Sequence, residues 1–129
     1  MFRILIDTHI LLWALSGDNR VNGKIRGILE DPAHQIFVSA VSIWEITIKH
    51  KKHPTRIGLQ PDRALQAALD TGFLLLDMSA RHAAESAQIP ALHGDPFDRL
   101  LIAQARTEPM HFLTCDAALK VYGYLVSLL

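Results

Sequence analysis

The sequence predicts an α/β fold in which helices cover both faces of a parallel β-sheet. Short apolar, β-branched runs alternate with longer segments of helical spacing along the whole chain. The first run, residues 2–6, is apolar apart from Arg3, which is typical of a strand buried on both faces. The chain has 129 residues, 50% of them hydrophobic, so we expect one domain over residues 1–129.

In the first half of the chain, turn residues separate the expected elements. A strand at 2–6 leads to a short buried helix at 10–15, which stops at Ser16 and Gly17. Helical spacing at 20–30 ends before Pro32, and a second strand follows at 35–39. A helix at 40–50 then runs into a loop around Pro54 and Gly58.

The second half repeats the alternation. Gly72 ends a helix at 61–70, and a strand at 73–77 precedes a helix at 79–88 that Ser79 can cap. Asp95 followed by Pro96 is a strong start signal for a helix at 96–107. A strand at 111–114, a short helix at 117–121 and a fifth strand at 124–128 complete the expected order.

Composition excludes several classes of protein. No apolar stretch approaches eighteen residues, so we expect no membrane span. The N-terminus lacks a basic region followed by a long apolar one, so a secretory signal is not expected. The single cysteine, Cys115, suits a reducing cytoplasm and reads as part of an apolar strand core. Basic and acidic residues balance at 13 each, so net charge does not indicate a nucleic-acid partner.

One basic run stands out against this balance. It consists of Lys49, His50, Lys51, Lys52, His53 and Arg56. Cations at a helix C-terminus are favoured by the helix dipole, so the run reads as a solvated helix end. It also reads as a phosphate-contacting patch, and the two roles are compatible.

Four carboxylates interrupt otherwise apolar segments. Asp7 and Asp116 each follow a predicted strand, whereas Glu45 and Asp98 lie early in predicted helices. Sites in open α/β sheets form beyond the carboxyl ends of the strands, where Asp7 and Asp116 are expected. Helix N-termini attract anions and could bring Glu45 and Asp98 to the same edge. Such a group of acids needs a positive partner, and Mg²⁺ or Mn²⁺ prefers oxygen ligands.

Each acid also has a purely structural interpretation. Asp98 lies in the first turn of its predicted helix, where the helix dipole favours an acid. Asp7 and Asp116 can each cap the helix that follows. Glu45 can form a capping box with Ser42, or pair with Lys49 four residues later on a solvated helix face. Capping and metal binding are compatible, and the sequence alone does not prove that the acids converge.

The chain from Arg3 to about Ala118 resembles the PIN-domain ribonucleases, and among them the VapC-like toxins of toxin–antitoxin pairs. The resemblance rests on four blocks in order: LIDTH with LLW at 5–13, SAVSIWEI at 39–46, HGDPFDRLLIAQA at 93–105 and LTCD at 113–116. The short first block alone is weak, but the long third block in order with the others is specific. The resemblance implies a PIN-like three-layer α/β/α sandwich with a central parallel sheet.

The resemblance further implies an Mg²⁺- or Mn²⁺-dependent endoribonuclease that acts as a toxin, is neutralised by a cognate antitoxin protein and forms a homodimer. The residues expected to bind the metal and carry catalysis are Asp7, Glu45, Asp98 and Asp116. Asp95 would support these acids, and we expect it chiefly as a helix cap. Thr8 and Thr114 would form hydrogen bonds with a carboxylate, a water or the local backbone. Those that would contact RNA are Lys49, Lys51, Lys52 and Arg99, although Arg99 could instead pair with an acid.

In this hypothesis Asp7 and Asp116 bind a first ion directly, and the other two acids complete the pocket directly or through water. The ion would activate a water for attack on a phosphodiester and neutralise charge on the phosphate. His9 and His93 lie near the motifs but are not expected to be catalytic, because a carboxylate-rich site needs no histidine ligand.

Three rival interpretations are weaker. An aspartyl-nucleophile phosphatase needs a second Asp where His9 stands, and a response-regulator receiver needs paired acids near the first strand and a late-strand lysine. The strongest rival is a catalytically weak or inert PIN-like module that binds another protein. Its docking face would use Ile43, Trp44, Ile46, Ile48, Leu65 and Leu69, although core packing is the commoner use of such spacing.

Overall fold

A computed structural model describes residues 2–21, 23–53, 60–91 and 95–123, and the backbone of 126–128. It confirms the predicted fold class. One five-stranded sheet has the order β3-β2-β1-β4-β5, and every pairing between neighbours is parallel. Its strands are β1 (Arg3–Ile6), β2 (Gln35–Ser39), β3 (Leu74–Leu76), β4 (His111–Thr114) and β5 (Val126–Leu128).

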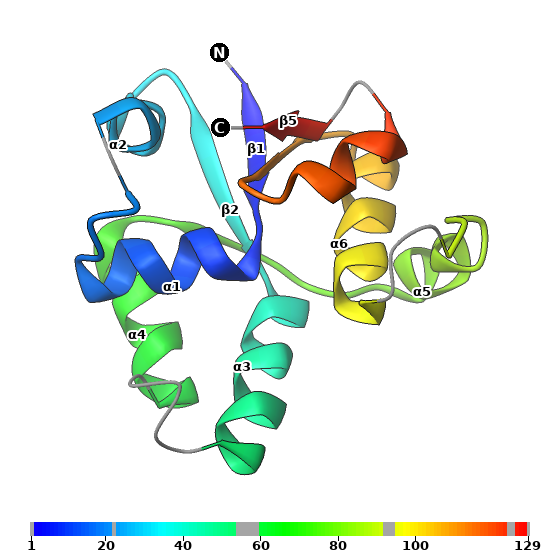
Figure 1. Cartoon of the computed structure of the whole chain (residues 1–129), viewed down its shortest axis with the longest axis horizontal. Helices are drawn as coiled ribbons and strands as arrows, with labels where there is room; N and C mark the ends of the chain where they lie inside the picture. The colour runs from blue at the N-terminus through cyan, green and yellow to red at the C-terminus, as the bar shows by residue number, and fades with distance from the viewer. Residues whose placement is uncertain (1, 22, 54–59, 92–94, 124–125, 129) are drawn as a thin grey trace.

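Helices connect the strands and lie around the sheet, as Figure 1 shows. They are α1 (Thr8–Ser16), α2 (Gly23–Glu30), α3 (Ala40–Lys52), α4 (Pro61–Thr71), α5 (Ala80–Ser86) and α6 (Pro96–Thr107), with a 3₁₀ helix, η1 (Ala117–Tyr122). The predicted bounds of β2, α6 and β4 are those observed.

The two faces of the sheet are buried against different helices. Ile4 and Ile6 of β1 and Leu113 of β4 pack on one side with residues of α1, α2 and α4. Leu5 and Phe112 point the other way and pack with residues of α6 and η1, with Val41 at the start of α3 and with Ile89 beyond α5. The alternation along β1 and β4 therefore produces the three-layer sandwich that the sequence predicts.

The first two helices begin at other residues than predicted. Helix α1 begins at Thr8 rather than residue 10, because Asp7 caps it by accepting a hydrogen bond from the Ile10 N–H (2.8 Å). Helix α2 begins at Gly23 rather than residue 20. The preceding residues form a turn in which the backbone N–H of Arg20 donates to the Asp18 carboxylate at 2.8 Å.

Helix α5 and strand β3 are shorter than predicted, as is β1, which begins at Arg3 rather than at residue 2. Helix α5 ends at Ser86 rather than 88, because the following residues close short i to i+3 turns. Strand β3 begins at Leu74, since the Phe73 N–H is bonded to the carbonyl of Ala68 at the end of α4. The loop around Pro54 and Gly58, Arg56, His93 and the predicted strand start at Tyr124 lie outside the described residues.

A buried polar chain ties α3 to α5 and α6. Ser39, which caps α3, donates its hydroxyl to the Gln104 side-chain oxygen, and Gln104 Nε2 lies 3.2 Å from His82 Nδ1. His82 Nε2 lies 2.6 Å from Glu108, whose backbone carbonyl accepts from Arg3 at 3.2 Å. Ser39 and Gln104 are fully buried and His82 nearly so, hence each polar group needs these partners.

Only part of the apolar face proposed for a protein-binding module is exposed. Trp44 is 51% exposed and Leu69 45%, whereas Ile46 is fully buried in the core. Ile43, Ile48 and Leu65 are half-buried. Most of this face is therefore used for packing. None of the helices in the described part of the chain is long and apolar enough to cross a membrane.

Candidate active site

The predicted acids lie around one edge of the sheet. Strands β1 and β4 are parallel neighbours in which Ile6 pairs with Leu113, so Asp7 and Asp116 leave the sheet at the same end. The Asp7 N–H donates to the Leu113 carbonyl at 3.1 Å and continues this pairing. Helix α3 packs against α1 and α6, and Figure 1 shows these three helices gathered at the end of β1.

Asp7 is buried, with an exposed fraction of 3%, and both of its carboxylate oxygens are engaged. Oδ1 accepts from the Ile10 N–H that begins α1, and Oδ2 accepts from the Thr114 hydroxyl at 2.5 Å. The predicted capping role is confirmed, and it holds the carboxylate in one orientation.

Thr114 connects the two strand-end acids. It is fully buried, and the oxygen that donates to Asp7 also accepts from the Asp116 N–H at 3.0 Å. Asp116 in turn caps η1 by accepting from the Ala118 N–H at 3.0 Å. Thr114 therefore forms hydrogen bonds with both a carboxylate and the local backbone. The sequence predicted either role without deciding between them.

Glu45 reaches the site from the second turn of α3, and it is only 2% exposed to solvent. Its Oε1 accepts from the Thr8 hydroxyl at 2.8 Å, which also lies 2.9 Å from Ser42 Oγ. Its Oε2 forms an ion pair with Lys49. The capping-box interpretation is wrong because Ser39, not Ser42, caps α3. The pairing with Lys49 is correct, but it involves a buried carboxylate rather than a solvated face.

The start of α6 supplies the remaining acids. Asp95 caps this helix by accepting from the Phe97 N–H at 2.9 Å, and Pro96 follows at the first helical position. Asp98 lies in the first turn and is half-buried. The structure thus bears out the cap interpretation of Asp95.

The electrostatics show that acids from distant parts of the chain act on one another. Burial raises the pKa of Asp98 to about 7, and the negative charges of Asp95, Glu45, Asp7 and Asp116 add to that rise. Burial also raises the pKa of Asp7, although the hydrogen bonds from Thr114 and Ile10 oppose the shift. A positive charge placed among these groups would relieve the repulsion.

The donors suit a hard cation, since all are carboxylate oxygens. Among the described residues, however, no three side chains of His, Cys, Asp or Glu lie close enough together to hold a metal ion. Mg²⁺ usually retains several waters and needs only one or two direct carboxylates, so this donor set fits a partly hydrated ion.

The predicted RNA-contacting cations lie in different settings. Lys49 is directed to Glu45 and its charge interacts with Asp95 and Asp98, so it belongs to the acid cluster. Lys51 and Lys52 are exposed in the last turn of α3, and Arg99 is half-buried in the first turn of α6.

A cavity of about 300 Å³ opens beside the acids, and Asp7 and Asp116 line it together with His9, Trp13, Arg20 and Cys115. Cys115 follows β4 rather than lying within it, and it is half-buried, not fully in the core. Burial raises the pKa of its thiol, and the charge of Asp7 adds to the rise.

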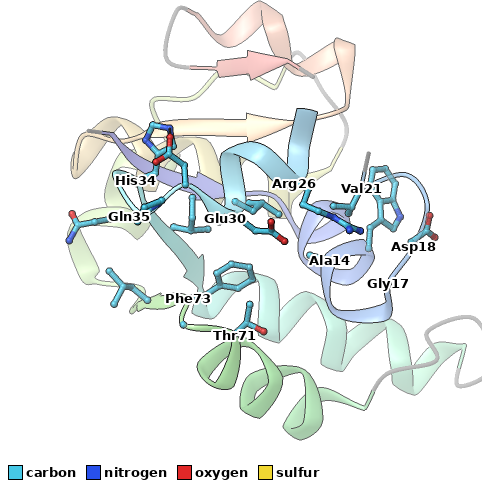
Figure 2. Close-up of a pocket in the computed structure, with 17 residues that line it drawn as sticks. Ala14, Gly17, Asp18, Val21, Arg26, Glu30, His34, Gln35, Thr71 and Phe73 are labelled. Carbon is cyan, nitrogen blue, oxygen red and sulfur yellow. Dashed lines mark ion pairs between the residues drawn. The ribbon is translucent and has the colours of Figure 1, made fainter. Parts of the chain in front are cut away.

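A larger cavity of about 540 Å³ lies elsewhere and contains none of the predicted site residues. Figure 2 shows residues such as Ala14, Arg26, Gln35 and Phe73 around it, from α1, α2, β2 and the residue before β3. Because nucleophile activation and phosphate chemistry need the carboxylates, we take the smaller cavity as the candidate active site.

Sequence reasoning missed two contributors to this site. Ser42 supports Thr8 from within α3, and Arg20 lines the cavity while its guanidinium lies 4.7 Å from the centre of the Trp13 ring. The S-x-x-E spacing drew attention to Ser42 for another reason. No local signal marks Arg20, because its position depends on the turn after α1.

The sequence matches the PIN domain family over residues 4–123, and the chain therefore belongs to that family. Its fold is similar to a chain of VapBC2 from Rickettsia felis bound to a promoter DNA fragment, with a TM-score of 0.68, 15% identity and coverage of 93% of this chain and 92% of that one. It is also similar to a chain of a Klebsiella pneumoniae toxin–antitoxin complex (TM-score 0.63, 24% identity, 91% and 90% covered).

A third similar structure is Mycobacterium tuberculosis VapC20, a toxin that cleaves the sarcin–ricin loop, with a TM-score of 0.59, 19% identity and 94% and 95% of the two chains covered. No curated protein matches this sequence. The resemblance to the PIN-domain family is therefore confirmed, and the resemblance to VapC-like proteins is confirmed at the level of the fold.

Proposed function

We propose that this PIN-domain protein is a metal-dependent endoribonuclease that acts as the toxin of a toxin–antitoxin pair. The observation that carries the proposal is the effect of Asp95, Glu45, Asp7 and Asp116 on Asp98, whose pKa is raised by burial and by these charges. Acids that raise one another's pKa values cluster at functional sites, and sites in parallel sheets form at this edge. Carboxylate oxygens are also the ligands that a hard divalent cation prefers.

Asp7 and Asp116 would hold the ion most directly, because Thr114 fixes the carboxylate of the first and the backbone of the second. Glu45 and Asp98 would complete the pocket directly or through water. The bound cation would supply neutralisation of the charge that develops on a phosphodiester. Thr8 keeps Glu45 oriented, and exposed Lys51 and Lys52 would attract the RNA backbone.

The test is the substitution Asp7→Asn, assayed by Mn²⁺-stimulated cleavage of RNA. The amide is isosteric and its oxygen can still accept from Ile10, so the fold should persist while the charge is lost. Loss of a residue that supports a metal ligand typically costs ~10–100-fold, so loss of a ligand should exceed ~100-fold.

Asp77→Asn is the matched control, because Asp77 also follows a strand but is exposed and is not among the acids that act on Asp98. It should cleave at the wild-type rate. A folded Asp7→Asn protein that cleaves RNA at the wild-type rate with Mn²⁺ would leave the PIN-like binding module as the better interpretation.

The partners of the protein are part of the same proposal. A cognate antitoxin is supported by the structural similarity to a chain of the Klebsiella pneumoniae toxin–antitoxin complex. The homodimer stays a prediction from the resemblance, and the cytoplasmic location stays a prediction from the single cysteine. Co-purification with the product of an adjacent open reading frame, followed by light scattering, would test the complex and the dimer.

A further inference from the structure

The acid cluster already contains a positive charge from this chain. The Lys49 ammonium forms an ion pair with Glu45 Oε2 one helical turn earlier on α3. The side chain of Glu45 is 3% exposed, whereas that of Lys49 is 41% exposed. The ion pair therefore joins the buried carboxylate of Glu45 to a lysine side chain that is partly exposed to solvent.

The surroundings of Lys49 hold the ammonium near several acids. Burial alone would lower the pKa of Lys49, but the hydrogen bond and charge of Glu45, with the charges of Asp95 and Asp98, outweigh it and raise the pKa. The ammonium also lies 5.9 Å from the centre of the Phe97 ring. These contacts favour a charged lysine that points into the cluster.

Both oxygens of Glu45 are consequently engaged. Oε1 accepts from Thr8 and Oε2 pairs with Lys49, so a cation that reaches Glu45 must displace a partner. The Lys49 side chain is the one able to move, because it is half exposed and flexible, whereas Thr8 is buried.

We propose that Lys49 is an internal counter-cation that occupies Glu45 in the metal-free protein and leaves it when a hard divalent cation binds. The affinity for the metal is then set by competition with this ammonium. Two positive charges repel each other at one carboxylate, so removing Lys49 removes a competitor. This inference rests on the proposed metal-dependent function.

The experiment is a calorimetric titration of the full-length protein with Mn²⁺ alone, without RNA. Lys49→Met, which retains the apolar stem, should bind Mn²⁺ about 10-fold more tightly than wild type, equivalent to about 1.4 kcal/mol. Lys49→Arg keeps the charge and should stay near the wild-type affinity. Lys51→Met removes an exposed charge from the same helix and serves as the control, with an unchanged affinity.

A second readout separates competition from a structural role. Metal-free Lys49→Met should unfold at a lower temperature than wild type, and saturating Mn²⁺ should raise its unfolding temperature by more than it raises that of the wild type. If the wild type binds Mn²⁺ and cleaves RNA but Lys49→Met binds Mn²⁺ equally well or more weakly, the role of Lys49 is refuted while the proposed function stands. Absence of Mn²⁺ binding in every variant overturns the metal-dependent function and the inference together.

Discussion

Thr114 offers the sharpest test of how the site is held together. Thr114→Val keeps the shape of the side chain and removes the hydroxyl that donates to Asp7 at 2.5 Å and accepts from the Asp116 N–H at 3.0 Å. A hydrogen bond to a charged group contributes about 1.5–3 kcal/mol, and a buried donor left without a partner costs about 1 kcal/mol or more. Thr114→Val should therefore lower the free energy of unfolding by about 3 kcal/mol.

In a chain of this length, about 1 kcal/mol corresponds to about 4 °C in Tm, so the expected decrease is about 12 °C. Thermal unfolding followed by circular dichroism without metal is the assay. Thr114→Ser keeps the hydroxyl and loses only a methyl group, hence its Tm should fall by about 4 °C or less. If Thr114→Val unfolds at the same temperature as Thr114→Ser, the hydroxyl does not hold the two acids and the reasoning fails.

Three further predictions concern charge and burial. The pKa of Asp98 is raised to about 7, so the folded protein retains a proton that the unfolded chain loses at about pH 4. The free energy of unfolding of the metal-free protein should therefore decrease as the pH rises from about 4 to about 7. Asp98→Asn should flatten that dependence in urea titrations. Charge removal at Lys51 and Lys52 together should weaken RNA binding and reduce its salt dependence by up to about two counterions; equal binding at low and high salt would exclude a phosphate contact. Gln104→Leu leaves the buried Ser39 hydroxyl without its acceptor and should cost about 2 kcal/mol in urea unfolding, whereas an unchanged midpoint would mean that this link contributes nothing.

The elements that local patterns specify were predictable from the sequence. Helix α6 begins at Pro96 because Asp95 caps it, and both signals are adjacent in the chain. The start of α2 was not predictable, because it depends on the hydrogen bonds that Arg20 makes with Asp18 in the preceding turn. Such turn contacts leave no periodic signal in the sequence.

The site shows the same division between local and distant interactions. The spacing of Glu45 and Lys49 predicts an ion pair, and one is present. Its burial was not predictable, since it requires Thr8, which is far away in the sequence, to dock beside Glu45. The sequence therefore predicts that Lys49 contacts RNA, whereas its neighbours in the structure are carboxylates.

The polar chain from Ser39 to Arg3 has a consequence for remote substitutions. Ser39 caps the helix that carries Glu45, and its hydroxyl is anchored through Gln104 and His82 to Glu108 at the far end of α6. Water cannot replace a lost link inside this chain, because its central members are buried. A change at Glu108 would therefore remove the partner that holds His82 and, through Gln104, weaken the support of the Ser39 cap of α3 without any alteration at the pocket itself.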